Sequence, residues 1–435
     1  MFRTALLLFV AAVSLQAQGH HWYYYTVDTT QIAGYSEVAF DSKGALKIAY
    51  RRQYQIWYGE MENHAVKLQK ADSGTGASAK IAFALDKADR PAIAYHDDVY
   101  QFTYLARHDG QKWVHSTIDV LKSGGVDFYH MDMVGATSGG FHIIYPKRKI
   151  PADNSLYYAR IDAEGAISDS GNVMDGLNGK WNSMTLDPDG KPIFAFFRHQ
   201  LESIQLSYDS AGTRKIQEIG TDWPVPPMGF YVSLKRDTGN TYYLAYRRKN
   251  PHEVRLLHGT PGGNWTDERV DTNLTLTLFN TPSVLGLGKN NAPFVAYPKT
   301  STEDGFVATQ SDLWLAWKKD TAWVREIVDS AGIVGEFMSM AVSPEGFPAI
   351  SYFDRTNRRL RLAVARASAP ADANDNGIPD YQEIVSIRKK GNRVLPGKAP
   401  KAKPGKVFDS RGKTWGPKAG KAVPAPGIWF QAKSE

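Results

Sequence analysis

The chain has 435 residues, of which 42% are hydrophobic and 22% charged, and its formal net charge is +7. It contains no cysteine, which excludes a disulfide framework and a lipidated cysteine behind a leader. The positive charge lies after residue 383, where 13 Lys and Arg face two acids, so this net +11 leaves −4 for residues 1–383. The excess charge is therefore a property of the C-terminal tail and is no sign of a nucleic-acid-binding domain in the rest of the chain.

Residues 1–17 have the organisation of a secretory signal peptide. Arg3 precedes an apolar run over residues 5–13, and a small residue, Ala17, stands at the expected cleavage point. The run is far shorter than the roughly 20 apolar residues that a transmembrane helix needs, and no other stretch is long and apolar enough. We therefore expect a secreted protein, extracellular or periplasmic, with no transmembrane segment.

Seven similar segments follow, each with an apolar strand, a turn such as Asp-x-x-Gly, and a second strand that ends in an aromatic residue. The intervals between these aromatics are 45, 50, 51, 50, 51 and 55 residues, and the aromatics are Tyr50, Tyr95, Tyr145, Phe196, Tyr246, Tyr297 and Tyr352. Two further strands are predicted in each segment, and the fourth often begins with Trp and ends in Asp, as over 113–119 and 265–271. This period is typical of four-stranded propeller blades and not of helical repeats.

The seventh segment lacks a fourth strand, because the chain passes into Ala-Ser-Ala-Pro-Ala after Arg366. The missing strand is found at the other end of the chain, where residues 22–28 have the same Trp-to-Val-Asp pattern as residues 323–329. The sequence thus predicts an all-β fold, a seven-bladed β-propeller over residues 18–368. Its N-terminal strand closes the ring, which leaves no free sheet edge between the first and last blades.

A calcium loop is predicted directly after the propeller. The segment D-A-N-D-N-G-I-P-D-Y-Q-E, residues 372–383, fits the spacing D-x-[DN]-x-[DN]-G-x5-E. Calcium takes roughly six to eight oxygen ligands, here expected from Asp372, Asn374, Asn376, the Ile378 carbonyl, Asp380 and Glu383. Without an entering helix, the loop resembles the shortened EF-hand-like repeats of bacterial secreted proteins, related in pattern to thrombospondin type 3 and dockerin loops. Residues 369–386 are expected to hold Ca²⁺ as a structural clip; the alternative is a polar turn.

Lys, Pro and Gly dominate residues 387–435, a composition that cannot bury enough apolar surface to fold alone. We expect a disordered basic tail that is either simply solvated or tethers the protein electrostatically to an anionic glycan, lipid or nucleic acid. The protein is expected to be monomeric.

Residues just after each second strand are the first candidates for function, because in a propeller they surround one mouth of the central channel. Most repeats carry a basic residue there, and the candidate ligand-binding residues are Arg51, His96, Lys147, Arg198, Arg247 and Lys299. A ring of cations favours an anionic ligand, such as a uronic-acid or sulfated polysaccharide. The alternative is that polar residues merely crowd these loops.

A candidate catalytic group lies on the same face. His130 and Tyr231 are each fifteen residues before the repeated aromatic, and Arg247 follows the second strand of the repeat that contains Tyr231. This grouping resembles, in fold and residue type alone, the His, Tyr and Arg constellation of propeller polysaccharide lyases that cleave ulvan. The resemblance implies that Arg247 neutralises a uronate carboxylate while Tyr231 and a histidine, either His96 or His130, exchange protons. The cysteine-containing zinc site of some of those enzymes has no counterpart here.

Two predicted turns, over residues 109–113 and 262–265, resemble the Asp-box of sialidase-like propellers but lack its Ser/Thr-x-Asp-x-Gly-x-Thr-Trp order. The sequence favours a secreted propeller that binds an extracellular glycan or a surface partner at the basic channel mouth. The alternative is a polysaccharide lyase or other glycan-degrading enzyme, so enzymatic activity is left open. A third hypothesis is a structural role in which the tail anchors the propeller to the envelope.

Overall fold

The computed structural model describes residues 19–30, 35–73, 77–97, 102–120, 130–149, 153–174, 178–198, 203–220, 232–248, 252–272, 282–302, 308–373, 378–382, 407–408 and 414–415. The chain divides into two units, Met1–Gln382 and Glu383–Glu435. The described part of the second unit is a short antiparallel pair, β29 (Val407–Phe408) with β30 (Thr414–Trp415). The predicted signal peptide and most of the predicted tail lie outside the described residues.

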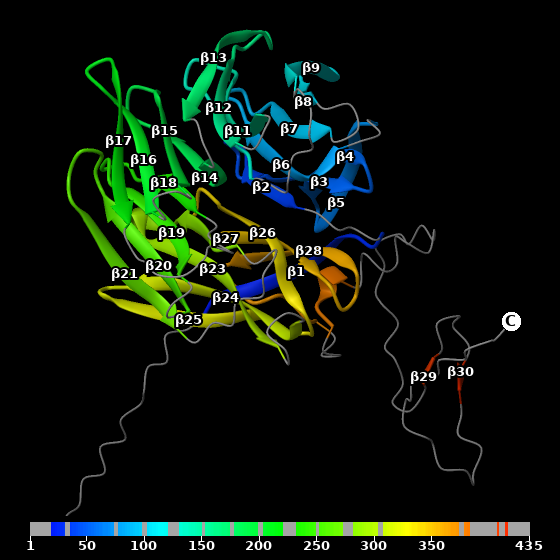
Figure 1. Cartoon of the computed structure of the whole chain (residues 1–435). Helices are drawn as coiled ribbons and strands as arrows, with labels where there is room; N and C mark the ends of the chain where they lie inside the picture. The colour runs from blue at the N-terminus through cyan, green and yellow to red at the C-terminus, as the bar shows by residue number, and fades with distance from the viewer. Residues whose placement is uncertain are drawn as a thin grey trace, which may run out of the picture. The chain divides into compact units, whose positions relative to one another are not determined.

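Seven antiparallel sheets of four strands each form the first unit, which confirms the predicted seven-bladed propeller (Figure 1). In six blades the four strands are consecutive in the chain. Blade one has β2 (Ser36–Phe40), β3 (Leu46–Arg52), β4 (Gln55–Glu62) and β5 (Ala65–Asp72); blade two has β6 (Ala77–Leu85), β7 (Pro91–Asp97), β8 (Phe102–His108) and β9 (Trp113–Val120); blade three has β10 (Asp132–Gly135), β11 (Phe141–Lys149), β12 (Asp153–Ile161) and β13 (Ile167–Met174).

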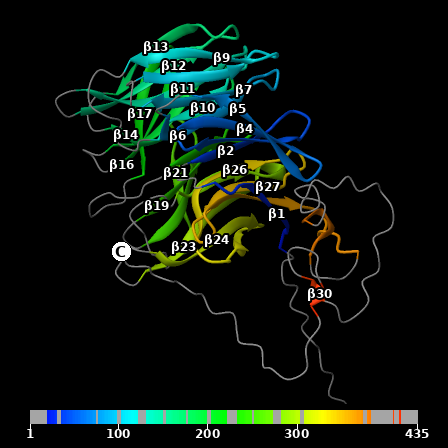
Figure 2. The ribbon, with the colours of Figure 1, turned by 90° about the vertical axis from the view of Figure 1, so that its right-hand side faces the viewer.

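Blade four has β14 (Asn178–Leu186), β15 (Pro192–Arg198), β16 (Ser203–Ser210) and β17 (Thr213–Gly220); blade five has β18 (Ser233–Arg236), β19 (Tyr242–Arg248), β20 (Glu253–Gly259) and β21 (Trp265–Thr272); blade six has β22 (Val284–Leu287), the 3₁₀ turn η1 (Lys289–Asn291), β23 (Pro293–Thr302), β24 (Ala308–Lys319) and β25 (Ala322–Asp329). The first strand of each blade is the innermost, and each innermost strand contacts that of the next blade. Figure 2 shows the blades from the side.

Blade seven is built from both ends of the propeller. Its strands are β26 (Val334–Val342), β27 (Pro348–Asp354), β28 (Arg359–Arg366) and the N-terminal β1 (His21–Asp28). β1 runs antiparallel to β28, with Trp22 opposite Ala365 and Tyr24 opposite Ala363. The predicted closure of the ring by the N-terminal strand is therefore confirmed.

The hydrophobic core lies between the blades. It consists of seven clusters of buried side chains, and each cluster draws on two neighbouring blades. Between blades four and five, for example, Ile193 and Leu206 pack with Leu234 and Leu244. Alternate residues of a strand point to opposite faces of its sheet, so each blade packs against the preceding blade with one face and against the next blade with the other. Burial of both faces holds the ring together.

A hydrogen bond between neighbouring blades explains why the repeat ends in Tyr and the fourth strand in Asp. The Tyr50 hydroxyl donates to Asp28 Oδ2 at 2.8 Å, and Tyr145 donates to Asp119 at 3.0 Å. We call this pair the Tyr–Asp latch. It joins the second strand of one blade to the fourth strand of the preceding blade, and the remaining described examples are Tyr95–Asp72, Tyr297–Asp271 and Tyr352–Asp329.

No helix among the residues described is both long and apolar enough to cross a membrane.

Candidate functional site at the channel mouth

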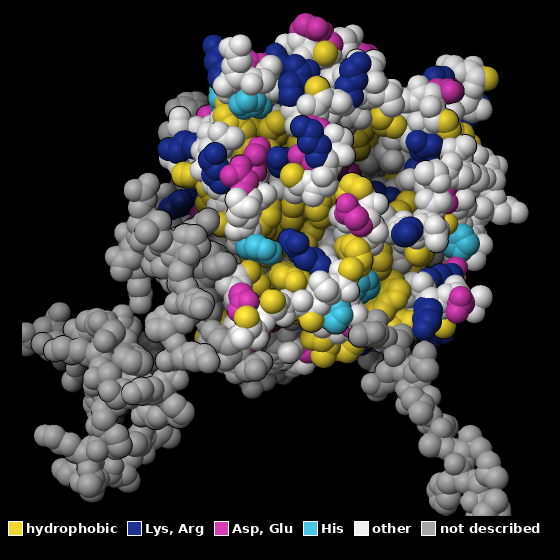
Figure 3. Space-filling model, turned by 180° about the vertical axis from the view of Figure 1, so that it is seen from behind, with side chains coloured by type: hydrophobic (Ala, Val, Ile, Leu, Met, Phe, Trp, Pro, Cys, Tyr) yellow, Lys and Arg dark blue, Asp and Glu magenta, His cyan; other side chains and the backbone are white. Residues whose placement is uncertain are grey.

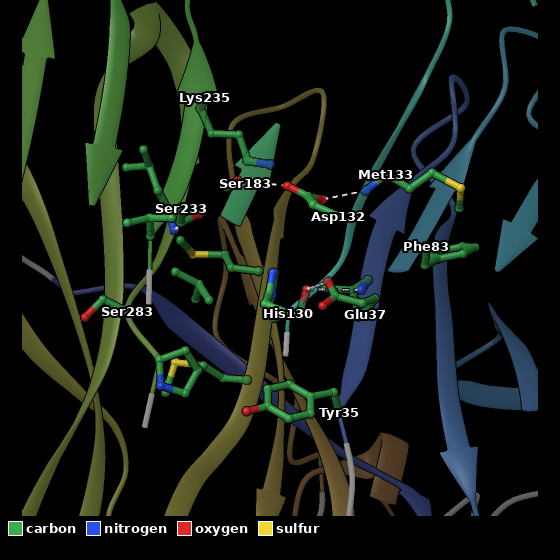
Figure 4. A pocket seen from close by; sticks show the side chains of 18 residues that line it. Tyr35, Glu37, Phe83, His130, Asp132, Met133, Ser183, Ser233, Lys235 and Ser283 are labelled. Atoms are coloured by element: carbon green, nitrogen blue, oxygen red, sulfur yellow. Dashed lines mark hydrogen bonds between the residues drawn. The ribbon is translucent and has the colours of Figure 1, made fainter. Parts of the chain in front are cut away.

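A cavity of about 110 Å³ lies among the innermost strands, and residues from all seven blades line it (Figure 4). Much of its polar lining comes from one repeated position, thirteen residues before the repeated aromatic, where each side chain is opposite the residue that precedes the aromatic. The polar residues at this position are Glu37, Asp132, Ser183, Ser233 and Ser339. In the other two blades the position is occupied by Ala82 and Val284.

These polar side chains connect successive innermost strands. The Ser183 hydroxyl donates to Asp132 Oδ2 at 2.8 Å and accepts the Leu234 N–H at 3.0 Å. The Ser339 hydroxyl donates to Glu37 Oε2 at 2.6 Å and accepts the backbone N–H of β2. The lining of the cavity is therefore held in place by hydrogen bonds between blades, and part of its polarity serves the fold.

Two buried groups of opposite charge lie near one another in the channel. Burial raises the pKa of Glu37 to about 7, and Asp132 adds to this rise, whereas Lys80 and Lys235 oppose it. Burial also lowers the pKa of Lys80 to about 7. Lys80 Nζ lies 4.0 Å from the centre of the Tyr35 ring, and Figure 4 shows Lys235 reaching toward Asp132. The pKa values of Glu37 and Lys80 thus both lie near neutral pH, where each group can take up or release a proton.

His130 lines the same cavity and is held in one tautomer. Its Nδ1 lies 2.9 Å from the carbonyl oxygen of Asn182. Because a carbonyl only accepts, Nδ1 must carry the proton, and Nε2 keeps the lone pair. Burial lowers the pKa of His130 to about 4, helped by Lys80 and opposed by Asp132. The ring is therefore neutral at neutral pH.

Three of the residues predicted at the rim of the channel mouth, Lys147, Arg198 and Lys299, occupy a second repeated position, two residues beyond the aromatic. Lys147 Nζ lies 2.8 Å from Asp119, and Lys299 Nζ lies 2.7 Å from Asp271. Each ammonium also lies over an aromatic ring, that of Tyr157 at 5.0 Å or of Trp314 at 4.4 Å. These cations therefore partner the latch aspartates while remaining partly exposed, at 20% for Lys147 and 28% for Lys299.

The other predicted site residues occupy different surroundings. His96 is buried at the interface of blades two and three, edge-on to the Tyr145 ring, and its Nδ1 lies 2.9 Å from Thr103 Oγ1. Burial lowers its pKa to about 4. Arg247 is buried as well, between blades five and six, where Nη2 donates to the Pro298 carbonyl at 3.3 Å.

The structure therefore brings only part of the predicted catalytic group to the cavity. Among the described residues, His130 lines it, whereas His96 and Arg247 lie between blades. Tyr231 lies outside the described residues. Of the remaining rim residues, Arg51 lies with its guanidinium 5.1 Å from the centre of the Tyr54 ring, and Arg198 ends β15.

The sequence analysis missed Glu37, Asp132 and Lys235. A signal for the first two exists, since counting back thirteen residues from each aromatic gives a position that is polar in five of seven repeats. No comparable signal marks Lys235, because the equivalent positions hold small or apolar residues or Thr.

Asp380, the ninth residue of the predicted calcium loop, is hydrogen-bonded to the start of the loop. The Asp380 N–H donates to the Ala371 carbonyl at 2.9 Å, and Asp380 Oδ1 accepts the Ala373 N–H at 3.1 Å. Of the expected ligands, Asp372, Ile378 and Asp380 are described, whereas Asn374, Asn376 and Glu383 lie outside the described residues. Within the described ranges there is no cluster of three His, Cys, Asp or Glu side chains suited to a metal.

Charges of both signs are interspersed on one face of the molecule. On the face in Figure 3, Lys and Arg side chains alternate with Asp and Glu and form no broad patch of one sign. The pairing of Lys147 with Asp119 and of Lys299 with Asp271 is a local case of this mixture. The electrostatic field that a ligand meets at such a position depends on the nearby charges more than on the net charge of the chain.

No protein-family model and no curated protein sequence matches the chain. Among solved structures, a protein of unknown function from Dyadobacter fermentans is similar, with a TM-score of 0.48 and 10% identity over 80% of this chain and 98% of that one. The six-bladed lectin of Aleuria aurantia has a TM-score of 0.47 and 11% identity, over 70% and 98% of the two chains.

An ulvan lyase of polysaccharide lyase family PL25 has a TM-score of 0.46 and 12% identity over 62% of this chain and 76% of that one. At this level of identity the similarity concerns the fold alone.

Proposed function

We propose that this chain is a secreted propeller that binds an acidic extracellular polysaccharide at the rim of the channel mouth. The observation that carries the proposal is the recurrence of Lys or Arg two residues beyond the repeated aromatic in five of the seven blades: Arg52, Lys147, Arg198, Arg248 and Lys299. All five lie in the C-terminal part of a second strand, so they lie on one rim of the ring. An anionic polymer that follows this rim meets a cation at most blades.

The rim is suited to many weak contacts and not to one strong one. Asp119 and Asp271 partly offset the charges of Lys147 and Lys299, but they also fix each ammonium against an aromatic ring. A fixed ammonium loses less side-chain entropy when a carboxylate or sulfate approaches. Because a polysaccharide presents its charges at regular intervals, several such contacts act together through effective concentration.

The test is retention of the full chain on immobilised polygalacturonate, alginate and heparin, with dextran as the neutral reference. Retention is expected on at least one acidic polymer and to fall as salt rises, because exposed charges are screened. The double substitution Lys147→Gln with Lys299→Gln is expected to weaken retention severalfold. Lys191→Gln is the matched control, since this exposed lysine is also paired with an aspartate, Asp209, but lies in the Asp-x-x-Gly turn at the other end of its blade.

A chain that ends at residue 386 separates the rim from the basic tail. If retention disappears with the tail and survives the double substitution, the tail is the polymer-binding element and the rim proposal is wrong. Equal retention on dextran would also contradict the proposal, because it would show that charge is not recognised.

A second candidate function is cleavage of the same polymer by a lyase reaction, and His130 is the observation that favours it. Its neutral ring lines the channel cavity and has a lone pair on Nε2, as a general base requires. Incubation with each acidic polymer, followed by ultraviolet absorbance of an unsaturated uronate, tests this. A rise in absorbance that His130→Gln abolishes would establish the lyase in place of a pure binding protein.

We also propose that residues 372–383 bind Ca²⁺ as a clip on the propeller. Asp372, Asp380 and the Ile378 carbonyl would act as ligands together with Asn374, Asn376 and Glu383. The support is that Asp380 is hydrogen-bonded to Ala371 and Ala373 at the start of the segment and that Tyr381, within it, is buried against β1.

A further inference from the structure

The interface between blades six and seven contains an open pocket of about 430 Å³, which we call the seam pocket. Its lining residues are Tyr24, Ile327, Val328, Asp329, Ser330, Ala331 and Arg361. They come from the end of β25, the turn after it, the closing strand β1 and β28. The volume is within the range of roughly 300–1,000 Å³ that is typical of small-ligand pockets.

The seam pocket is lined by Arg361 of β28, at a third-strand position where most blades have an aromatic residue. The position opposite the latch tyrosine is aromatic in four blades, namely Trp57, Tyr104, Tyr157 and Trp314. In the other three blades it is Gln205, Arg255 and, in blade seven, Arg361, which lies opposite Tyr352. A guanidinium on a flexible stem thus replaces a rigid ring at this place, and it brings hydrogen-bond donors to the interface.

A second departure lies on the facing strand. Two residues before the latch aspartate, the described repeats have Thr26, Lys70, Thr117 and Arg269, which are all polar. Blade six has Ile327 instead, and it is 47% exposed. An isoleucine at a solvent-facing position loses favourable burial unless something covers it. Two departures from the repeat therefore meet in one pocket.

Arg361 keeps donors available for a ligand. Nη1 donates to Asp329 Oδ2 at 2.5 Å, whereas Nε is buried and has no hydrogen-bond partner among the residues that the structure describes. The arginine at the same repeat position of blade five differs, because Arg255 is hydrogen-bonded to both Glu253 and Asp267. The Arg361 side chain is 14% exposed, and Asp329 engages only Nη1 in the part of the chain that the structure describes, so the guanidinium keeps further N–H groups at the pocket.

The charges of the pocket indicate a neutral ligand. Asp329 and Arg361 balance one another, and Asp329 already accepts hydrogen bonds from the Tyr352 hydroxyl at 2.6 Å and the Ala331 N–H at 3.0 Å. A carboxylate or sulfate would lie beside the Asp329 carboxylate and be repelled. A sugar hydroxyl has no such penalty, and it can accept from Arg361 and exchange hydrogen bonds with the Ser330 hydroxyl.

We propose that the seam pocket is a binding site for a neutral monosaccharide unit. Arg361 and Ser330 hydrogen-bond its hydroxyls, and the Ile327 side chain packs against the apolar face of the sugar ring. This site contains none of the five rim cations and takes an uncharged ligand, so it does not depend on the proposed binding of acidic polymers.

The experiment is a titration of the full chain with D-galactose, D-mannose, L-fucose, N-acetyl-D-glucosamine and, as the charged reference, D-glucuronate, followed by saturation-transfer NMR and calorimetry. Saturable binding of at least one neutral sugar is expected, with glucuronate weaker. Ile327→Thr, which restores the residue type of Thr26 and Thr117, is expected to weaken binding about fivefold through lost apolar contact.

Ile216→Thr is the matched control, because Ile216 is another exposed isoleucine, at 42%, on the outer strand of blade four. It is expected to leave binding unchanged. Arg361→Lys is expected to weaken binding further, and its unfolding temperature shows whether loss of the Asp329 contact has also disturbed the fold. The proposal is overturned if no neutral sugar binds saturably, if glucuronate binds better, or if Ile327→Thr binds as tightly as the unsubstituted chain.

Discussion

One phenolic hydroxyl shows what the repeated tyrosine contributes. Tyr297 is fully buried, and its hydroxyl donates to Asp271 Oδ2 at 2.5 Å across the interface between blades five and six. Burial, together with Asp271, raises the pKa of Tyr297 well above its usual range, so the hydroxyl remains a donor at every pH at which the protein is folded. The same aspartate also pairs with Lys299.

We therefore expect Tyr297→Phe to destabilise the propeller by about 1–2 kcal/mol, because Asp271 loses a buried donor while the ring packing is kept. Equilibrium urea unfolding measures the change. Tyr54→Phe, which removes the hydroxyl of an exposed tyrosine, is the control and should change the free energy of unfolding by less than about 0.5 kcal/mol. Equal effects of the two substitutions would show that the latch contributes nothing beyond packing.

Glu37 gives the channel a pH-dependent contribution to stability. It faces Lys80 of β6, Asp132 of β10 and Lys235 of β18, and it accepts a hydrogen bond from Ser339 of β26. Because burial raises its pKa from 4.5 to about 7, the folded chain binds the proton more tightly than the unfolded chain does. The stabilisation is therefore fully present below pH 4.5 and is lost as the pH rises to about 7.

The substitution Glu37→Gln removes this titration. Relative to the unsubstituted chain, the variant is expected to become progressively more stable between pH 4.5 and 7, by roughly 1–3 kcal/mol over that window. Urea unfolding at a series of pH values measures the difference, and Glu62→Gln, at an exposed acid, is the control. Parallel stability profiles for Glu37→Gln and the unsubstituted chain would contradict the burial of an ionisable Glu37.

At the scale of elements, the segment after the propeller returns to the strand that closes it. The Tyr381 hydroxyl accepts the Tyr24 N–H at 2.8 Å, and its ring lies among those of Tyr23, Tyr25 and His64. The predicted calcium loop thus contains a side chain that contacts both β1 and blade one. Ordering of this loop by Ca²⁺ would hold the closing strand in place, because a ligand that binds only the folded state stabilises it.

We expect Ca²⁺ to raise the thermal unfolding midpoint of the full chain and a chelator to reverse the rise. The gain should approach about 2.7 kcal/mol when Ca²⁺ is ~100-fold above its dissociation constant. Asp372→Asn is expected to abolish the response, and Asp320→Asn, in the exposed turn between β24 and β25, is expected to retain it. If the midpoint of the unsubstituted chain does not depend on Ca²⁺, the loop is only a polar turn.

At the scale of the whole molecule, the sequence predicted the ring and its closure but only part of the site. Blade number and closure follow from local patterns that recur, and the pattern shared by residues 22–28 and 323–329 was sufficient to place the closing strand. The prediction did not include Glu37 and Asp132 as lining residues of the cavity. They come together only where strands far apart in the sequence meet around one channel.

The direction of individual rim side chains was also beyond the pattern. Neighbouring residues of a strand point to opposite faces, so the residue directly after the aromatic turns into the blade interface, as His96 and Arg247 do, and the next one stays at the rim, as Lys147 and Lys299 do. The sequence showed which end of the strand these residues occupy, but it did not show which face each one takes.

The closing strand β1 permits a test of the ring as a single cooperative unit. Trp22 packs in the core between blades six and seven, and Tyr23, Tyr25 and Val27 pack between blades seven and one. Removal of residues 1–28 would expose both cores, leave the outer edge of β28 unpaired and remove the Asp28 partner of the Tyr50 latch. Burial of these four side chains alone contributes on the order of 5 kcal/mol or more.

We therefore expect the chain that starts at residue 29 to unfold at a much lower temperature than the full chain or to lose its cooperative transition, while the chain that starts at residue 18 keeps the midpoint of the full chain. Differential scanning calorimetry measures both, and a synthetic peptide of residues 19–30 is expected to restore part of the loss by adding the missing strand to β28. If the shortened chain unfolds at the midpoint of the full chain, the blades are stable one by one and the ring does not need its closing strand.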